Sequence, residues 1–150
     1  MEYSLLTLDI ESSTSEILKT CRELGVTIVA SSPVGRGVLT GQFRSHTDIP
    51  ENDWRRQLPK YSEENFTKIL ELVQGLKDVA STHGSTPTQV ALAWLLAQGP
   101  EIIPIPGTKS PAKMDENAAS ALLQLSGQEV QDIRILAERT YIEGTRYPAA

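Results

Sequence analysis

The sequence predicts an α/β protein with a parallel sheet, and three observations support this fold class. Two short apolar runs, at 26–30 and 102–106, have the length and composition of strands. Segments with a helical spacing of apolar residues lie between and after them, which is the alternation found in α/β proteins. The first run is almost continuously apolar, which is typical of a strand buried on both faces of a parallel sheet. A length of 150 residues favours one domain that spans 1–150.

Capping signals mark where the helices begin. Residues 13–16 match a capping box, in which a Ser hydroxyl and a Glu carboxylate satisfy each other's backbone amides, and Gly25 is placed to end the helix that follows. Thr86 and Gln89 form the same pattern. The expected helices cover 17–24, 62–83, 86 to the Gly99-Pro100 stop, 110–123 and 126–139.

The remaining segments are expected to be less regular. Residues 2–10 predict a short strand fragment and a loop, and the prolines within 102–106 predict a short, irregular strand. The polar stretch 31–60 is long enough to be functional or disordered. The tail, 141–150, is expected to be irregular.

Composition and charge exclude several classes of protein. At a net charge of −5 with scattered basic residues, the chain lacks the clustered Lys and Arg that nucleic-acid binding requires. Its apolar runs fall short of the ~20 residues of a membrane span, and its first residues do not resemble a secretory signal. No spacing of ligand residues predicts a metal site. We therefore expect a cytoplasmic protein with no nucleic-acid or membrane partner. Cys21, the single cysteine, excludes an internal disulfide and predicts a buried thiol.

The loop at 31–41 carries residues suited to an anionic ligand. It directly follows the first strand and combines three glycines with Ser32 and Arg36. Ligands of parallel α/β folds lie where loops leave the carboxyl ends of strands, and glycines let the backbone approach a phosphate closely. A glycine-rich surface turn is the alternative, since the spacing matches neither a Walker nor a Rossmann motif.

A second such loop, at 106–113, runs from the second strand through a glycine into a helix. Exposed amides at a helix start favour an anion, and two lysines lie beside this one. Further along the chain, the carboxylate of Glu116 and the side-chain amide of Asn117 could form hydrogen bonds with the edge of a purine. The polar residues concerned are Lys109, Ser110, Lys113, Glu116 and Asn117. The alternative is an ordinary capped helix with solvated lysines.

Three motifs in order resemble those of the aldo-keto reductase family. They are ASSPVGRGVLTG (30–41), TPTQVALAWLL (86–96), and IPIPGTK (103–109) with EN (116–117). They look like the loop after the family's seventh strand, the helix that follows it, and the eighth strand with its adenosine-phosphate loop. The resemblance covers essentially the whole chain. It implies a single truncated domain that corresponds to the last two to three β/α units of a (β/α)8 TIM barrel.

The resemblance also implies a cofactor and an activity, the NADP(H)-dependent reduction of aldehydes and ketones. It assigns Ser32, Val34 and Arg36 to the pyrophosphate, and it makes Gly107 part of the cofactor loop. It assigns Lys109, Ser110 and Lys113 to the 2'-phosphate, and Glu116 and Asn117 to the adenine. The lysines would favour NADP(H) over NAD(H).

Two departures from the family pattern affect catalysis. The aromatic residue on which the nicotinamide stacks is replaced by Ser31, which removes a stacking contribution of about 1 kcal/mol and leaves open whether NADP(H) binding is retained. The family's catalytic Asp, Tyr, Lys and His lie in the first half of the barrel, whereas this chain begins near the sixth strand, so its catalytic residues are unknown. His46 and His83 are expected to be solvated or capping. None of the four tyrosines of the chain matches the family's proton donor. They are Tyr3, Tyr61, Tyr141 and Tyr147.

An incomplete barrel has consequences for partners. Two strands and a fragment cannot close eight strands, so sheet edges and apolar helix faces would be exposed. We expect a homo-oligomer, or a partner chain that supplies the missing barrel half, with a small-molecule metabolite as ligand. The leading interpretation is a truncated or split relative of an NADP(H)-dependent aldo-keto reductase that lacks the catalytic tetrad. The alternatives are a recruited non-redox enzyme (isomerase, cyclase or dehydratase), a non-catalytic interaction subunit, and a partial gene product with no independent role.

Overall fold

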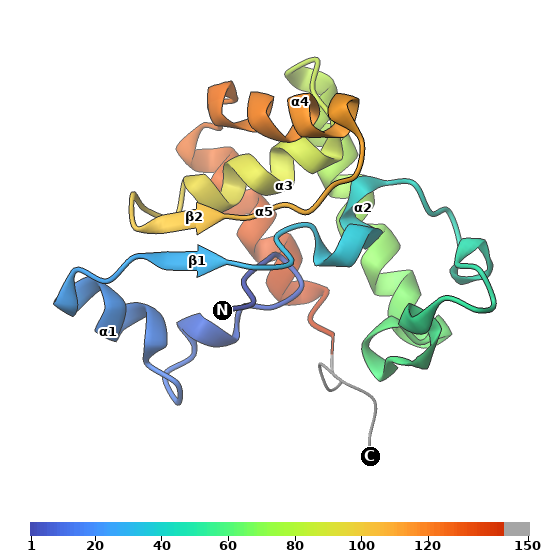
Figure 1. Ribbon diagram of the computed structural model, residues 1–150, viewed down its shortest axis with the longest axis horizontal. Helices are drawn as coiled ribbons and strands as arrows, with labels where there is room; N and C mark the ends of the chain where they lie inside the picture. The colour runs from blue at the N-terminus through green and yellow to red at the C-terminus, as the bar shows by residue number, and fades with distance from the viewer. Residues whose placement is uncertain (143–150) are drawn as a thin grey trace.

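The computed structural model of the chain describes residues 1–142. Its regular elements, in order, are α1 (Ile17–Leu24), β1 (Ile28–Ala30), α2 (Glu63–Thr82), α3 (Pro87–Leu96), β2 (Ile102–Pro104), α4 (Pro111–Ala119) and α5 (Gly127–Arg139) (Figure 1). Short 3-10 helices lie at Asp9–Glu11, Gly35–Thr40, His46–Asp48, Trp54–Gln57, Pro59–Tyr61 and Ser120–Leu122. The predicted type and order of the helices and of the two strands are therefore confirmed. The segment 31–60, expected to be a loop, contains three of these 3-10 helices and the start of a fourth.

The two strands form one parallel sheet. Ile28 pairs with Ile102 and Ala30 pairs with Pro104. The strand fragment expected at 2–10 is reduced to two isolated bridges, a parallel one from Glu2 to Ser31 and an antiparallel one between Ser4 and Thr7. Because β1 and β2 run in the same direction, the segments that leave their carboxyl ends start side by side (Figure 1). This arrangement confirms the α/β class with a parallel sheet.

The expectation that the first strand is buried on both faces was wrong. Ile28 and Ile102 are buried, on the side where α3 packs against β2. On the opposite face Val29 is 47% exposed and Ile103 is 49% exposed. Alternate residues of a strand point to opposite faces of a sheet, and within residues 1–142 only one face of this sheet is covered. The other face is left as an apolar surface.

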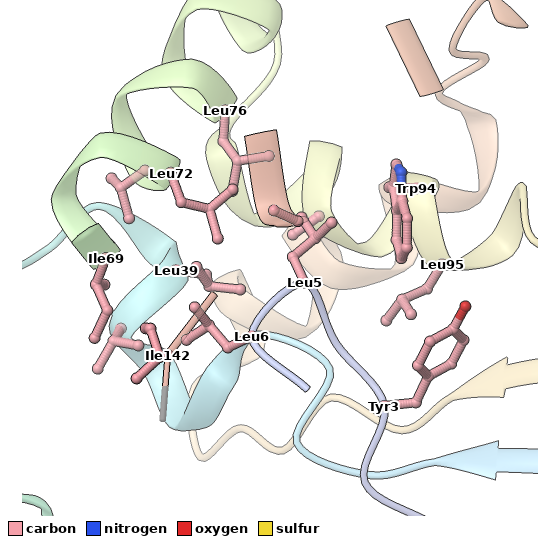
Figure 2. Packing of buried hydrophobic residues seen from close by; sticks show 14 of the residues in the cluster. Tyr3, Leu5, Leu6, Leu39, Ile69, Leu72, Leu76, Trp94, Leu95 and Ile142 are labelled. Atoms are coloured by element: carbon pink, nitrogen blue, oxygen red, sulfur yellow. The ribbon is translucent and has the colours of Figure 1, made fainter. Parts of the chain in front are cut away.

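The core is built around α3, whose residues 90–95 are all buried. Side chains of α2 and of the first residues of the chain pack beside it, among them Leu5, Leu72 and Leu76 (Figure 2). The ring of Trp94 meets that of Tyr3 edge-on at 6.2 Å between centroids. Its indole N–H donates to the carbonyl of Val130 at 3.0 Å. One helix therefore anchors both the beginning of the chain and α5.

Arg134 strengthens this connection. Its guanidinium donates two hydrogen bonds to the Glu11 carboxylate and one to the Gln98 side chain at 2.7 Å. The same guanidinium lies 5.0 Å from the centre of the Trp94 ring. The hydroxyl of Tyr3 donates to the same Glu11 carboxylate. The segment before α1 is thus held to α5 by a partly buried polar network.

The helix starts at α3 and α5 follow the prediction. Thr86 and Gln89 form a complete capping box at α3, and Ser126 and Glu129 form one at α5. Gly25 ends α1 in the left-handed conformation, with φ of 65°. These three signals therefore identified true helix ends.

The capping box predicted at 13–16 was wrong. Glu16 directly precedes α1 with φ of 45°, outside the extended region that an N-cap residue normally adopts. Its carboxylate pairs with Lys19 at 2.9 Å. The hydroxyl of Ser12 accepts from the backbone of Ser15, so the serines stabilise a turn before the helix and do not cap it.

Two further expectations change in detail. Cys21 is partly buried against the core, not fully buried as predicted. The helix expected at 110–123 ends at Ala119, and a 3-10 turn continues it, because the Ser120 hydroxyl donates to the carbonyl of Asn117 at 2.6 Å and the chain tightens there. Of the tail expected to be irregular, residues 143–150 lie outside the described range.

No helix within residues 1–142 combines the length and the apolar character needed to cross a membrane.

Candidate functional site

The loops that follow β1 and β2 meet around one cavity of about 610 Å³. Of the nine residues predicted to bind a cofactor, seven line it: Ser32, Val34, Arg36, Gly107, Lys113, Glu116 and Asn117. The parallel pairing of the strands brings these loops to one edge of the sheet, and α4 then carries its polar side chains along the same wall. The predicted residues from distant parts of the sequence are therefore neighbours in space.

The other two predicted residues, Lys109 and Ser110, line an open groove of about 680 Å³. Gly107, Thr108 and Lys113 line both this groove and the cavity, so the two spaces adjoin each other. Both lysines are exposed. An elongated ligand could therefore extend from the cavity past two lysines.

The loop after β1 has an unusual backbone conformation. Ser32 and Arg36 both have positive φ, at 52° and 57°, and Gly35 and Gly37 do so as well. Positive φ is costly for residues with a side chain, by roughly 1–2 kcal/mol each, and such strain is concentrated at functional sites. The hydroxyl of Tyr61 donates to the Gly35 carbonyl at 3.3 Å and supports the loop from behind.

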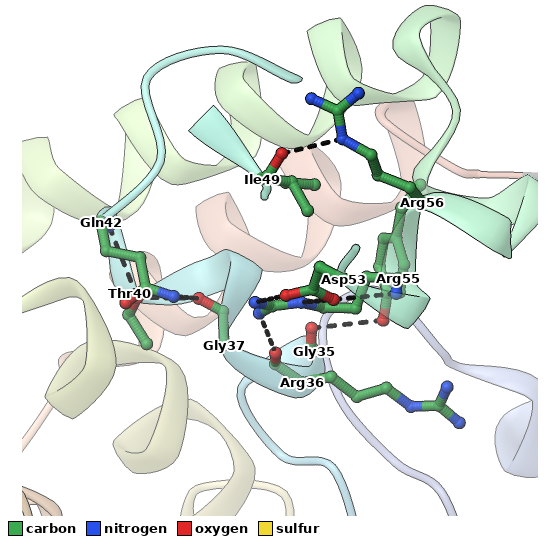
Figure 3. A network of polar contacts seen from close by, with 10 residues as sticks. Gly35, Arg36, Gly37, Thr40, Gln42, Ile49, Asp53, Arg55 and Arg56 are labelled. Carbon is green, nitrogen blue, oxygen red and sulfur yellow. Dashed lines mark hydrogen bonds and ion pairs between the residues drawn. The ribbon is translucent and has the colours of Figure 1, made fainter. Parts of the chain in front are cut away.

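Two arginines lie beside this loop, and each already has a carboxylate partner. The Arg36 guanidinium is 3.8 Å from the carboxylate of Glu2 and 4.9 Å from the centre of the Trp54 ring. Arg55 binds Asp53 at 2.6 Å and donates to the carbonyl of Arg36 at 2.9 Å. Figure 3 shows Arg55 against Asp53, and the Arg36 side chain extending away from Gly37.

Arg55 is a cavity residue that the sequence did not identify. Its hydrogen bonds keep the pKa of the Asp53 carboxyl below its ordinary value. Because both arginines are neutralised by neighbouring acids, they contribute less net positive charge to the cavity than the sequence suggested. Lys113, which lines both the cavity and the groove, and Lys109, which lines the groove, are then the principal source of positive charge at the site.

The start of α4 offers backbone donors. Ser110 precedes the helix with an extended backbone, and its side chain makes no capping hydrogen bond. Its own amide donates to the Thr108 hydroxyl at 3.1 Å. The first turn of α4 contains no acidic residue. A helix start of this kind favours an anion, and Lys113 is the third residue of α4.

Glu116 is held by residues of another helix. Its carboxylate accepts a hydrogen bond from the Thr86 hydroxyl at 2.6 Å, and its backbone carbonyl accepts one from the Gln89 amide at 3.1 Å. Thr88, the second residue of α3, also lines the cavity. The beginning of α3 therefore forms part of the wall, although the sequence indicated it only as a capping signal.

The residues considered for catalysis have structural roles within the described chain. Burial and the neighbouring Glu11 raise the pKa of Tyr3, and burial raises the pKa of Tyr61 to about 12. His46 packs edge-on against Phe66 at 5.8 Å. His83 caps the end of α2. Tyr141 is 58% exposed, and Tyr147 lies outside residues 1–142.

Two further features of the sequence, the serine at position 31 and the absence of a metal-ligand pattern, can be compared with the structure. The Ser31 hydroxyl donates to the carbonyl of Met1 at 3.0 Å, so it is engaged with backbone. Residues 1–142 contain no group of three or more His, Cys, Asp or Glu side chains that could hold a metal ion.

Comparison with known sequences finds relatives that all belong to one family. The model of the aldo/keto reductase family matches residues 1–138. Aldo-keto reductase str7 of Strobilurus tenacellus is 53% identical over 146 residues, which are 97% of this chain and 44% of that protein. Aldo-keto reductase yakc [NADP(+)] of Schizosaccharomyces pombe is 45% identical over 148 residues, or 99% of this chain and again 44% of the relative. The chain thus spans less than half the length of these curated relatives.

Solved structures show the same fold over part of their length. A thermostable aldo-keto reductase, Tm1743, is 27% identical with a TM-score of 0.62, and the match covers 90% of this chain and 38% of that one. The glycerol dehydrogenase AKR11B4 from Gluconobacter oxydans is 24% identical with a TM-score of 0.81, and the match covers 93% of this chain and 41% of that one. The fold of residues 1–142 is therefore that of a portion of these larger proteins.

Proposed function

Because the chain belongs to the aldo/keto reductase family, we propose that it binds the adenosine-phosphate half of NADP(H) in the cavity between the loops that follow β1 and β2. The observation that carries this proposal is the convergence of two distant loops on one cavity of about 610 Å³. That volume lies within the range of about 300–1,000 Å³ that is usual for small-molecule sites. The name of the Schizosaccharomyces pombe relative specifies NADP(+).

The charges of the site fit the phosphates of this cofactor. Lys109 and Lys113 lie along the groove at the start of α4, where backbone amides also favour an anion. A ribose 2'-phosphate in the groove would be met by both lysines and by Ser110. We therefore expect the chain to prefer NADP(H) to NAD(H).

The pyrophosphate would lie against the loop after β1. Ser32 and Val34 line the cavity there, and the carbonyls of these two residues accept hydrogen bonds from the amides of Gly35 and Gly37, which hold the turn. The arginines are paired with Glu2 and Asp53, so we assign them to shaping the loop at least as much as to neutralising phosphate. Glu116 and Asn117, at the α4 side, offer polar groups to the adenine.

Carbonyl reduction needs a proton donor as well as the hydride that NADPH supplies when bound. Tyr3 and Tyr61 are buried, donate their hydroxyls to protein acceptors, and have raised pKa values. Neither is suited to protonate a substrate in the cavity. We therefore propose that residues outside this chain supply the catalytic acid, as in a truncated or split reductase, and that the chain alone binds the cofactor without turnover.

The uncovered sheet face supports a further part of the proposal, that additional polypeptide completes the barrel. Val29, Ile103 and Ile105 are each about half exposed. An apolar groove of about 380 Å³ lies beside β2, lined in part by Leu96 and Met114. Apolar surface of this kind, next to an unpaired strand edge, favours association with a second copy or a partner chain.

The cofactor proposal is tested by titrating the purified chain with NADPH and with NADH, following the fluorescence of the reduced nicotinamide. The double variant Lys109→Ala plus Lys113→Ala should bind NADPH about tenfold more weakly or worse, because two charged contacts to one phosphate are lost. Its affinity for NADH should change much less. Lys19→Ala plus Lys68→Ala removes two exposed lysines that do not line the cavity, and should leave both affinities unchanged.

Two results would contradict the cofactor proposal. One is the absence of NADPH binding at millimolar concentration by the folded chain. The other is an equal loss of NADPH and NADH affinity in the Lys109 and Lys113 variant, which would mean that these lysines do not contact the 2'-phosphate. Reduction of an aldehyde by the isolated chain would contradict the assignment of the catalytic acid to residues outside it.

A further inference from the structure

The capping box at the start of α3 makes contacts that capping does not require. A capping box needs two acceptors, the hydroxyl oxygen of the N-cap residue and the side-chain oxygen of the third helical residue. Thr86 and Gln89 fulfil this, since the Thr86 hydroxyl accepts from the amide of Gln89 at 3.2 Å and the Gln89 side-chain oxygen accepts from the amide of Thr86 at 3.0 Å. Each side chain then has a donor left over.

Both remaining donors are directed to Glu116. The Thr86 hydroxyl donates to Oε1 of its carboxylate at 2.6 Å, and the Gln89 amide nitrogen donates to its backbone carbonyl at 3.1 Å. A hydroxyl can accept and donate at once, and a carboxamide has separate acceptor and donor atoms. An Asp cap or a Glu at the third position would provide the cap but not these donors.

The capping box of α5 provides an internal comparison. There the third residue is an acid, Glu129, and the Ser126 hydroxyl donates back to that same carboxylate at 2.8 Å. The Ser126 hydroxyl therefore donates to a residue of its own capping box. At α3 the third residue is Gln89, and the hydroxyl proton of Thr86 goes to a side chain 30 residues further along. The use of Gln in place of Glu is thus accounted for by the contact with Glu116.

We infer that Thr86 and Gln89 are positioning residues that hold the Glu116 carboxylate fixed in the cavity, so that it selects a ligand with a 6-aminopurine over one with a 6-oxopurine. Oε1 is engaged by Thr86, and the hydrogen bonds of this carboxylate to residues 1–142 are made through that atom, so Oε2 is the oxygen left to accept from a ligand. This inference rests on the proposed function, because it takes adenine as the base that reaches Glu116.

Fixing the carboxylate matters because the two bases present donors in different places. A 6-aminopurine donates from its exocyclic amino group, whereas a 6-oxopurine donates from the neighbouring ring nitrogen and presents an acceptor at position 6. A loosely held carboxylate can move to meet either donor. When both the backbone and the side chain of the residue are held in place, its carboxylate can be aligned with the donor of only one base. Bound to the other base, the carboxylate faces an acceptor, and the hydrogen bond is lost at a cost in binding free energy.

The probes are adenosine 2',5'-bisphosphate and its deaminated counterpart, inosine 2',5'-bisphosphate, with binding to the 150-residue chain measured by calorimetry. The readout is the ratio of the two affinities, in which effects common to both probes cancel. The wild-type chain should bind the adenosine compound about tenfold more tightly, as expected for one hydrogen bond to a charged acceptor.

Thr86→Asp keeps a good helix cap but replaces the hydroxyl donor with a carboxylate that repels that of Glu116, so the ratio should fall to within about twofold and the thermal midpoint should fall as well. Thr86→Ser keeps both functions and should keep the wild-type ratio. Gln89→Glu preserves the capping box in the form seen at α5 and is the second test, should Thr86→Asp fail to fold. Ser126→Asp changes a cap that lies outside the cavity and should leave the ratio unchanged.

The outcomes separate the inference from the function on which it rests. If the wild-type chain binds the adenosine probe and a folded Thr86→Asp or Gln89→Glu variant keeps the tenfold ratio, the inference is wrong and the proposed function stands. Equal binding of both probes by the wild-type chain also overturns the inference alone. If neither probe binds the folded wild-type chain, the proposed function fails, and the inference fails with it.

Discussion

The imidazole Nε2 of His83 lies 2.7 Å from a carboxylate oxygen of Glu129, and this contact joins the end of α2 to the beginning of α5. The same carboxylate accepts from the amide of Ser126 at 2.7 Å and from its hydroxyl at 2.8 Å. The hydrogen bonds from Ser126 and then that from His83 lower the pKa of Glu129 to about 2. One side chain thus caps a helix and connects it to a second.

This carboxylate predicts acid sensitivity of the fold. A group whose pKa is lower in the folded than in the unfolded chain contributes stability that is present above its ordinary pKa and is lost as the pH falls toward the folded value. The contribution of Glu129 should therefore disappear between about pH 4.5 and about pH 2. Because the side chain is 26% exposed, we expect it to be only about 1 kcal/mol.

The measurement is urea unfolding of the wild type and of Glu129→Gln from neutral pH to pH 2.5. Glutamine can still accept from Ser126, so the variant removes the charge and keeps the cap. The difference in unfolding free energy should be present at pH 5 and shrink as the pH falls from there to 2.5. The exposed Glu71→Gln is the control on α2. A Glu129→Gln difference that grows between pH 5 and pH 2.5 would contradict this account.

The loop after β1 predicts a contrast between two glycines. Gly35 and Gly84 have nearly the same positive φ, 57° and 59°. A Cβ at Gly35 would lie 2.7 Å from Cδ1 of Leu6, whereas one at Gly84 would meet nothing within 4 Å. Gly84→Ala should therefore cost only the backbone strain, about 1 kcal/mol.

Gly35→Ala should cost the same strain plus the overpacking against Leu6, about 2–4 kcal/mol in total. It should also weaken NADPH binding, because Val34 and Arg36, on either side of Gly35, line the cavity. Thermal unfolding and NADPH titration of both variants test this. Equal destabilisation by the two substitutions would show that the contact with Leu6 relaxes without cost.

The uncovered sheet face predicts association of the purified chain. Val29 and Ile103 are adjacent partners in the strand pair and are both about half exposed. Sedimentation velocity should show species larger than the monomer, and Val29→Ser plus Ile103→Ser should shift them toward the monomer. Leu24→Ser plus Leu122→Ser, at exposed positions outside the sheet, is the matched control. A strictly monomeric wild-type chain, at every concentration tested, would contradict the proposal of a partner on this face.

Sequence reasoning succeeded where local pattern and chain topology decide the structure. Thr86 and Gln89 were recognised as a helix start, and the backbone there allows the predicted capping. The equivalent pattern at 13–16 failed because Glu16 takes a left-handed conformation, which depends on the turn before it. The meeting of the two loops could be predicted because parallel strands place their carboxyl ends at one edge.

The parts of the site that could not be predicted depend on contacts between distant segments. Arg36 was expected to face a pyrophosphate, and its pairing with Glu2 depends on how the first residues return to the sheet. Arg55 reaches the cavity because the segment 42–61 folds back over the loop, which no local pattern specifies. The contact between Thr86 and Glu116 likewise depends on how two helices cross.

The parallel pairing of β1 with β2 has a consequence for how such a protein can evolve. All residues of the described chain that line the cavity fall between Ser32 and Asn117, so one continuous stretch of the amino-acid sequence supplies them. A recombination event with breakpoints outside that stretch would transfer all of these lining residues together to a new genetic context. Ligand recognition and bond-making chemistry can then be inherited separately, and each can diverge at its own rate.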